Sequence, residues 1–288
     1  MNNGALYQVK ASLRQSNLRA KKRLGQHFLV DEDVLQRIIS TAELDHEDTV
    51  VEVGPGLGVL TRRLAEQVAT VIAVELDSRL VSILRKTLSR FPNVKVVHAD
   101  ILKVAPGQLL EDYSVFPERP QRYKVVANLP YYITSPVLRH FLQADAKPSL
   151  MVVMVQKEVG EAIAATPGNM SLMSIMTQLH AVPTIVSYVP AKSFYPSPKV
   201  DSLILRLDVR PKPAIEVSDL DSYLSTVNCG FSSPRKQLRN SLSQALGIPP
   251  SQIALSLEKA GIEARRRAET LSLAEWKRLW EVLAPLKG

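Results

Sequence analysis

The 288-residue sequence predicts a doubly wound, Rossmann-like α/β domain followed by a small all-α domain. Short apolar runs rich in β-branched residues alternate with amphipathic segments through the first two thirds of the chain. This alternation is typical of a mostly parallel sheet with helices on both faces. A glycine-rich turn follows the first of these runs, and beyond residue 217 every periodic segment has helical spacing.

The expected elements follow one another in a regular order. Strands are expected at 49–53, 71–75, 94–97, 123–127 and 150–155, with helices at 59–68 and 78–90 among the connections. An antiparallel pair, 184–189 and 202–209, is expected at the sheet edge. Two prolines in 210–217 indicate a linker, and helices are expected at 220–229, 234–246, 251–259 and 273–283. The domains are therefore expected at 1–210 and 211–288.

The composition restricts the class of protein. With 45% hydrophobic and 22% charged residues it is that of a globular protein. No apolar run approaches the roughly 20 residues of a membrane helix, and the first 15 residues lack the apolar region of a secretion signal. The single cysteine, Cys229, excludes an internal disulfide and a multi-cysteine metal site. We expect a cytoplasmic, monomeric protein with no membrane or metal partner.

The net charge of +8 is unevenly distributed. Residues 1–23 contain six Lys and Arg and no acidic residue, and further basic clusters lie at 233–239 and 265–267. Such clusters bind polyanions because neutralised phosphates release counterions. A solvated basic surface is the alternative, but three separate clusters favour nucleic acid as the partner.

The carboxyl ends of three expected strands carry the residue types of a nucleotide-like cofactor site. Gly54, Gly56 and Gly58 allow a tight turn and close approach of a ligand to the backbone. Glu75 ends the second strand, where an acid can accept hydrogen bonds from ribose hydroxyls. Asp100 ends the third strand, although capping the next helix would also explain it. A plain tight connection is the alternative for the glycines.

NAD and S-adenosylmethionine both fit this pattern. The order Gly-Pro-Gly-Leu-Gly differs from the Gly-x-Gly-x-x-Gly that binds a pyrophosphate. Glu52 also precedes the turn, and its carboxylate would attract a sulfonium or ammonium and repel pyrophosphate. The sequence therefore favours S-adenosylmethionine.

The fourth expected strand ends in ANLPYY, at 127–132. An adenine amine is a poor nucleophile because its lone pair is delocalised. The Asn128 side-chain oxygen and a backbone carbonyl near Leu129 could accept its two N–H groups and direct the lone pair at a methyl donor. Pro130 fixes the backbone, and Tyr131 offers a face for an unstacked base. A Pro-containing loop with a core tyrosine is the alternative.

Six motifs occur in order along the chain: KRLGQHFL (22–29), EVGPGLG (52–58), ANLPYYITSP (127–136), QKEV (156–159), FYPSPKVDS (194–202) and FSSPRKQLRNSL (231–242). Together they resemble the ribosomal RNA adenine dimethyltransferases, and specifically the bacterial small-subunit class. The resemblance implies transfer of methyl groups from S-adenosylmethionine to the exocyclic amines of two adjacent adenines in the 3′-terminal hairpin loop of 16S rRNA. It implies the immature 30S subunit as partner.

The resemblance also implies roles for individual residues. The expected donor site comprises Gln26, His27, Leu29, Glu52, Gly54, Gly56, Glu75, Leu76, Asp100, Ile101 and Asn128. The expected catalytic loop runs from Asn128 to Tyr131, and Phe194 would stack on the target adenine opposite Tyr131, although a lid or a plug is possible from its sequence context. A binding or packing role is favoured over general base for His27. The expected RNA contacts are Lys21, Lys22, Arg23, Arg235, Lys236 and Arg239.

One stretch departs from the family pattern. Relatives carry Tyr-Gly-Arg-Leu-Ser after QKEV, whereas 168–178 reads GNMSLMSIMTQ, which puts in doubt the contacts of that Tyr and Arg. Three other readings stay open: a 23S rRNA adenine methyltransferase of the macrolide-resistance class, a non-catalytic RNA-binding or transcription-assembly factor, and an NAD dehydrogenase. The KVDS and FSSPRKQLRNSL motifs and the EVGPGLG spelling favour the small-subunit class over the first. The intact 128–131 loop argues against the second, and the glycine spacing with Glu52 against the third.

Overall fold

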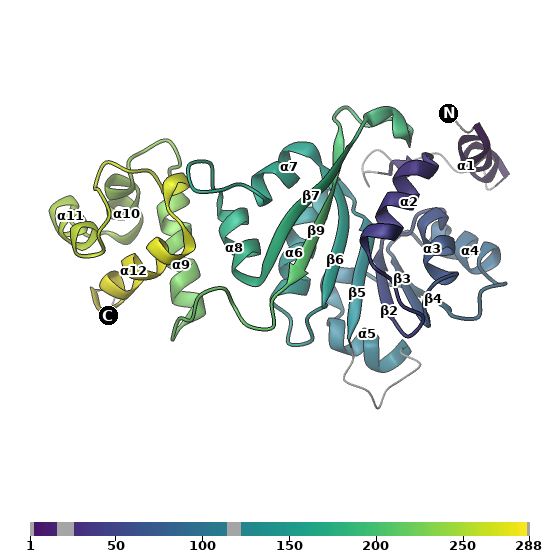
Figure 1. Cartoon of the computed structure of the whole chain (residues 1–288), viewed down its shortest axis with the longest axis horizontal. Helices are drawn as coiled ribbons and strands as arrows, with labels where there is room; N and C mark the ends of the chain where they lie inside the picture. Colours follow the sequence, from purple (N-terminus) through teal and green to yellow (C-terminus); the bar gives the residue numbers. More distant parts are fainter. Residues whose placement is uncertain (1–2, 16–25, 114–121, 287–288) are drawn as a thin grey trace. The chain divides into compact units, whose positions relative to one another are not determined.

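The computed structural model describes residues 3–15, 26–113 and 122–286, which form two compact units (Figure 1). The first unit is Met1–Gly160 with Val182–Val209, and the second is Glu161–Ala181 with Arg210–Gly288. This division differs from the expected ranges by the segment 161–181 and by residue 210. The reason is that helix α8 (Leu172–His180) contributes Ile175 and Leu179 to the same buried core as Tyr223 of the second unit.

The first unit contains a seven-stranded sheet in the order β4-β3-β2-β5-β6-β9-β7. The pairings among β2 to β6 are parallel, and β9 is antiparallel to β6. This confirms the predicted doubly wound class, with β9 inserted so that β7 alone forms that edge. The strands are β2 (Thr49–Val53), β3 (Thr70–Glu75), β4 (Val94–His98), β5 (Tyr123–Asn128), β6 (Leu150–Gln156), β7 (Ala181–Val189) and β9 (Ser202–Val209).

The central strands form from short segments that are mostly apolar and β-branched, with Glu52 and Glu75 near the carboxyl ends of β2 and β3. All five residues of β2 and all six of β3 are buried, as expected where helices cover both faces of a parallel sheet. Asp31 and Asp77 begin two of the helices by accepting backbone N–H bonds at the N-cap. The helices of this unit are α1 (Asn3–Gln15), α2 (Glu32–Thr41), α3 (Val59–Ala65), α4 (Ser78–Thr87), α5 (Pro106–Tyr113) and α6 (Thr134–Leu142). The boundary between the two units falls within α7 (Lys157–Ile163).

A two-stranded sheet that the sequence did not predict lies apart from the large sheet. In it β1 (Phe28–Leu29) pairs antiparallel with β8 (Phe194–Tyr195). Two further bonds extend the pairing: Val30 N donates to Ser193 O at 2.9 Å, and Ser193 Oγ donates to Asp31 Oδ2 at 2.7 Å. Two motifs 165 positions apart in the chain, since 194 − 29 = 165, are thereby held together.

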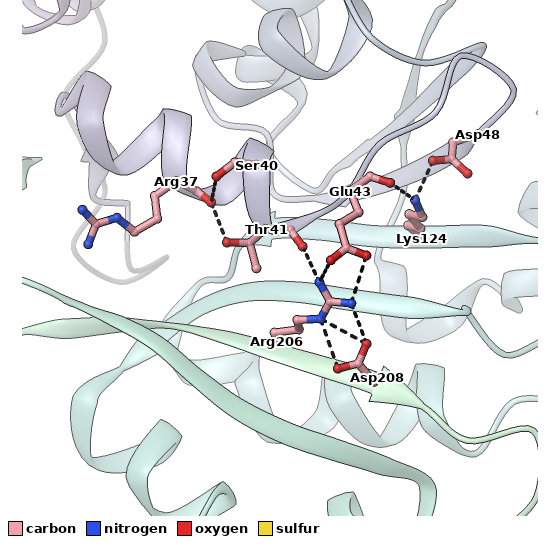
Figure 2. A network of polar contacts seen from close by, with 8 residues as sticks. All are labelled: Arg37, Ser40, Thr41, Glu43, Asp48, Lys124, Arg206 and Asp208. Carbon is pink, nitrogen blue, oxygen red and sulfur yellow. Dashed lines mark hydrogen bonds and ion pairs between the residues drawn. The ribbon is translucent and has the colours of Figure 1, made fainter.

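An ion-pair network connects the end of α2 to the end of the sheet where the parallel strands begin (Figure 2). Arg206 of β9 donates to Glu43 Oε1 at 2.6 Å, to the Thr41 carbonyl at 3.0 Å and to Asp208 Oδ1 at 2.8 Å. Lys124 at the start of β5 pairs with Asp48 at 2.7 Å. Hydrogen bonding to Arg206 lowers the pKa of Glu43. This edge lies opposite the carboxyl ends of the parallel strands and has a structural role.

The second unit is helical. Besides α8 it contains α9 (Leu220–Phe231), α10 (Leu238–Leu246), α11 (Pro250–Lys259) and α12 (Leu273–Leu283). A Cβ at Gly230 would come within 2.2 Å of Trp276, so glycine permits the close approach of α9 to α12. The prediction that α10 begins at residue 234 was wrong by four positions, because 232–237 form a turn in which Lys236 N donates to Ser233 O. No helix among the described residues is long and apolar enough to cross a membrane.

Candidate active site

A cavity of about 190 Å³ opens where the parallel strands of the first unit end. Because β2, β3 and β5 run parallel, their last residues meet at one edge of the sheet. All the residues predicted for the donor site and the catalytic loop line this cavity: Gln26, His27, Leu29, Glu52, Gly54, Gly56, Glu75, Leu76, Asp100, Ile101, Asn128, Leu129, Pro130 and Tyr131.

The glycine turn allows three segments to converge. Gly54 and Gly56 have φ values of 66° and 60°, which residues with a side chain rarely adopt. A Cβ at Gly54 would lie 3.3 Å from Pro130 Cγ, and one at Gly56 would lie 3.1 Å from Phe28 Cε1. The turn therefore packs against both the catalytic loop and the N-terminal motif, and a larger residue would push either away.

Glu75 is fixed in the position expected of a ribose acceptor. Its Oε2 accepts from Gly56 N at 3.2 Å and its Oε1 accepts from Asp77 N at 2.9 Å. Burial raises the pKa of Glu75, and these two backbone bonds oppose that shift. Each oxygen has a second lone pair for a ligand hydroxyl.

Glu52 is the most unusual group in the cavity. Its side chain is 2% exposed, and its Oε2 has no hydrogen-bond partner among the described residues. Burial is the main cause that raises the pKa of Glu52 to about 8; the Thr61 hydroxyl opposes the shift, and the nearby Glu75 carboxylate adds to it. An orphaned buried carboxylate is costly unless a ligand satisfies it, and a cationic group would do so.

Asp100 caps a short helix, as one interpretation of its position predicted, and it also lies at the cavity. Its Oδ1 accepts from Leu102 N at 3.1 Å and caps the short helix Ile101–Lys103, while the side chain also lines the cavity. Leu76 is 50% exposed at the same cavity, and Ile101 is buried. These apolar side chains beside carboxylates suit an adenosine, which has a flat apolar face and polar ribose hydroxyls.

The amide of Asn128 is oriented by the N-terminal motif. Its Nδ2 donates to the His27 carbonyl at 3.2 Å, so its Oδ1 is the half that can accept from a ligand. The Leu129 N–H donates to Met154 O at 3.1 Å, and no hydrogen bond among the described residues uses the Leu129 carbonyl. Pro130, with φ −58°, then turns the chain into the short helix Tyr131–Ile133.

His27 and Tyr131 form an aromatic pair beside the Asn128 amide. Their ring centroids are 5.9 Å apart with an interplanar angle of 23°. His27 Nδ1 donates to the Pro196 carbonyl at 2.6 Å, and the Tyr131 hydroxyl bonds Ser202 Oγ at 2.7 Å. Burial raises the pKa of Tyr131, which keeps the phenol protonated. Both rings are thus held by the 194–202 motif.

Phe194, predicted to stack on the target adenine, is buried in this structure. The side chain is 2% exposed, belongs to the buried core of the first unit and does not line the cavity. Its backbone pairs with Leu29 in the two-stranded sheet of β1 and β8. In this structure Phe194 packs in the core beside that sheet, and its stacking on a target base stays a prediction.

The predicted basic residues fall into two groups. Lys21, Lys22 and Arg23 lie outside the described residues. Arg235 and Lys236 are exposed in the turn between α9 and α10, and Arg239 in the first turn of α10 is half-buried. Within the cluster at 265–267, Arg266 is a structural residue that pairs with Glu275, whereas its two neighbours are exposed.

Sequence reasoning missed several residues that line or support the cavity. Phe28 and Leu57 are apolar residues of its lining, and Tyr132, which is 53% exposed, also lines it. Ser202, the hydrogen-bond partner of Tyr131, belongs to the KVDS motif. Its place in the same motif as Phe194 could have indicated that it lies near the site. No signal in the sequence separated Tyr132 from a surface tyrosine.

Comparison with known proteins adds an independent observation. A family model described as ribosomal RNA adenine dimethylase matches residues 17–284. The chain belongs to this family. Proteins named Ribosomal RNA small subunit methyltransferase A are similar to it throughout: one from Dehalococcoides mccartyi is 48% identical, covering 94% of this chain and 91% of the relative. Another, from Shouchella clausii, is 40% identical over 96% of this chain and 93% of the relative.

Solved structures of the family are also similar. A dimethyladenosine transferase from Plasmodium falciparum superposes with a TM-score of 0.74 at 26% identity, covering 90% of this chain and 98% of the other. The 23S rRNA methyltransferase ErmE superposes with a TM-score of 0.68 at 32% identity, covering 89% and 99%.

Membership of the family makes this chain an S-adenosylmethionine-dependent methyltransferase. The residues that line the cavity also fit that donor, independently of the comparisons. The unsatisfied Glu52 carboxyl is placed to receive a cation, and the fixed Glu75 carboxylate can accept from hydroxyls. The glycine turn leaves room where a Cβ would contact Pro130 or Phe28. A pyrophosphate would have to lie beside two carboxyls, so the NAD reading is excluded.

Proposed function

We propose that this enzyme dimethylates two adjacent adenines in the 3′-terminal hairpin loop of small-subunit rRNA, acting as a monomer on the immature 30S particle in the cytoplasm. The names of the relatives at 40–48% identity support the small-subunit assignment. The KVDS and FSSPRKQLRNSL motifs support it against the 23S class. Enzyme and substrate would meet in the cytoplasm because ribosomal particles are assembled there in bacteria.

The orientation of Asn128 is the observation that carries the proposal. Its donor half is bound to the His27 carbonyl, so its Oδ1 and the unused Leu129 carbonyl form a pair of acceptors at the cavity. An exocyclic amine has two N–H donors, and this pair matches them. A ring nitrogen or a ribose hydroxyl would leave one acceptor unsatisfied, which costs free energy in a buried site.

The remaining lining residues would hold the methyl donor. Glu75 and Asp100 would accept from the ribose and adenine, with Leu76 and Ile101 against the adenine faces. Glu52 would face the methionine end, where its ionised form would neutralise the bound cation. The donor supplies an electrophilic methyl group bonded to a cationic sulfur.

The chain's own residues would prepare the amine. Two directed acceptors favour a pyramidal nitrogen and align its lone pair, so the rate would come from orientation and charge placement. Tyr131, held by Ser202 and stacked on His27, would support the face of a flipped-out adenine. No strong base is required, because the amine becomes acidic only as its new bond forms, and water or the acceptors can then take the proton.

Mass spectrometry of methylated rRNA tests the proposal. Immature 30S particles from cells lacking the modification would be incubated with the enzyme and S-adenosylmethionine, and 50S particles would be treated in parallel. We expect two adjacent dimethyladenosines near the 3′ end of the small-subunit rRNA and none in the large-subunit rRNA. Methylation of a single large-subunit adenine would instead assign the chain to the activity for which ErmE is named. Transfer to neither would leave only a binding role.

A further inference from the structure

Helix α1 is anchored on the wall of the donor cavity. Val9 and Leu13, one turn apart, are 2% and 7% exposed and pack in a cluster with Phe28, Leu57 and Leu80. The last three residues also line the cavity. Burial of its apolar face fixes the position of a helix that would be marginally stable alone at 13 residues.

The other side of α1 carries an aromatic ring and two cations. Tyr7, Lys10 and Arg14 have the spacing i, i+3, i+7, which places them on one face of the helix. Tyr7 is 75% exposed, the most exposed among the large apolar side chains of the described residues, and Arg14 is also exposed. The Lys10 ammonium lies 5.1 Å from the centroid of the Tyr195 ring.

Continuous contacts connect this face to the catalytic loop. Tyr195, beneath Lys10, lies opposite Phe28 in the β1–β8 ladder. His27 precedes Phe28 and stacks on Tyr131. The face formed by Tyr7, Lys10 and Arg14 therefore lies next to the paired strands β1 and β8, which support the Tyr131 ring proposed to bind the base. Nucleotides next to a flipped-out base could reach this face.

We propose that the face formed by Tyr7, Lys10 and Arg14 binds unpaired rRNA beside the target adenine, with Tyr7 stacking on a base and the two cations contacting phosphates. This inference rests on the proposed function, because it takes rRNA as the substrate. The charge supports RNA: the first acidic residue of the chain is Asp31, after six Lys and Arg. A lipid surface does not fit, because the apolar face of α1 is already buried against the protein.

Binding of the full-length enzyme to immature 30S particles, measured across a range of salt concentrations, tests the inference. The Lys10→Ala/Arg14→Ala variant should bind about tenfold more weakly, and its log–log salt slope should fall by about 1.4, for two single-strand phosphate contacts. Tyr7→Ala should weaken binding about tenfold with an unchanged slope, since stacking is uncharged. The matched control is Lys86→Ala/Arg90→Ala, at the end of α4 and just beyond it, which removes the same charge from exposed positions.

Affinity for S-adenosylhomocysteine reports whether α1 stays in place and should change by less than about twofold in all variants, because Val9 and Leu13 are intact. Unchanged RNA affinity and slope in the Lys10/Arg14 variant would overturn the inference, as would an equal loss in the Lys86/Arg90 control. Methylation by the wild-type enzyme is measured on the same particles. If it fails, the proposed substrate fails; if it succeeds and the α1 variants match wild type, only this inference fails.

Discussion

The side-chain amide of Asn128 is held by one hydrogen bond to the N-terminal motif at 22–29. Its amide nitrogen is bound to the His27 carbonyl, so a segment 101 positions away in the sequence determines which way its oxygen points. A single strand-end asparagine thereby becomes a directed acceptor. This explains why the N-terminal motif and the catalytic loop belong to one site, although the sequence separates them widely.

Substitution of Asn128 tests its role as acceptor. Asn128→Ala should lower turnover by about 100-fold or more, a loss comparable with that of one preorganised hydrogen-bonding group in other active sites. The affinity for S-adenosylhomocysteine, measured by calorimetry, should fall less than about threefold. Asn169→Ala, at an exposed asparagine of the second unit, is the matched control and should leave both quantities unchanged. Retained turnover in Asn128→Ala would remove Asn128 from the mechanism.

Glu52 should couple donor binding to pH. Its pKa of about 8 in the free enzyme means that it is mostly protonated at neutral pH, and a cationic donor should ionise it. Donor binding at pH 7 should therefore release up to about one proton, and affinity should rise with pH until about 8. Calorimetry in buffers of different ionisation enthalpy measures this release. In Glu52→Gln the release should disappear; its persistence there would assign the proton to another group.

The same shift has a consequence for stability. Because the folded-state pKa of Glu52 lies above its ordinary value of 4.5, the folded state binds more protons than the unfolded state between about pH 4.5 and 8. Stability should therefore fall as pH rises through this window, by a few kcal/mol at most. Thermal unfolding of Glu52→Gln should lack this part of the slope and exceed wild type at pH 8. A parallel pH dependence in both proteins would contradict the burial argument.

Helix α12 illustrates how one element depends on a charged cap. Ser272 and Glu275 form a reciprocal capping box at its N-terminus, and Arg266 pairs with Glu275 from the preceding turn. Hydrogen bonding to Arg266 lowers the pKa of Glu275 to about 2. The Arg265–Arg267 cluster, which looked like a polyanion site in the sequence, is thus partly committed to holding this helix.

The capping box of α12 should lose its stabilising effect in acid, when Glu275 becomes protonated. A lowered folded-state pKa contributes stability above about pH 4.5 that is lost as pH falls toward about 2. The protection factors of the α12 backbone amides, which compare exchange with that of an unfolded chain at the same pH, should therefore fall over this window in the wild type. Glu275→Gln should show lower protection at pH 7 and a weaker pH dependence of the protection. Equal protection of α12 in the two proteins at pH 7 would show that the ion pair does not stabilise the cap.

The elements that sequence predicted well are those with long periodic patterns. The five parallel strands were found within one residue of their expected bounds, because buried β-branched runs have few other solutions. The two-residue strands β1 and β8 have no detectable period, and their pairing is non-local. The start of α10 was misplaced because helical periodicity continued through a turn that Pro234 and the Ser233 carbonyl favour.

The candidate site was predictable where residues end parallel strands. Gly54, Glu75, Asp100 and Asn128 converge because strand ends of one sheet must meet. The 194–202 motif reaches the site through the Pro196 carbonyl and the Ser202 hydroxyl, whereas Phe194 is buried and its contact with a base stays a prediction. A sequence pattern identifies the segment, and only packing decides which side chain faces the cavity.

At the level of the whole chain, the cavity and the exposed basic turn lie in different units. The first unit contains the whole donor cavity and the catalytic loop. The second has a core of its own and presents Arg235 and Lys236 on an exposed turn. We therefore expect RNA affinity to depend on both units and the chemical step to depend on the first.

Neutralising the turn of the second unit tests this division. Arg235→Ala/Lys236→Ala/Arg239→Ala should weaken binding to immature 30S particles and lower the salt slope by about 2, for up to three phosphate contacts. Turnover at saturating substrate should change less than about threefold. Lys259→Ala, at the end of α11, is the control for an exposed cation of the same unit. An unchanged slope would mean that this turn does not contact phosphate.

The central claim is that an adenine amine is held by Asn128 and Leu129 beside the donor cavity. Cryo-electron microscopy of the enzyme on an immature 30S particle, with an unreactive analogue of the donor bound, tests it directly. The flipped-out adenine should lie against Tyr131, with its amine about 3 Å from Asn128 Oδ1 and from the Leu129 carbonyl. A target adenine that approaches the donor from another side, with its amine beyond hydrogen-bonding reach of Asn128, would contradict the account.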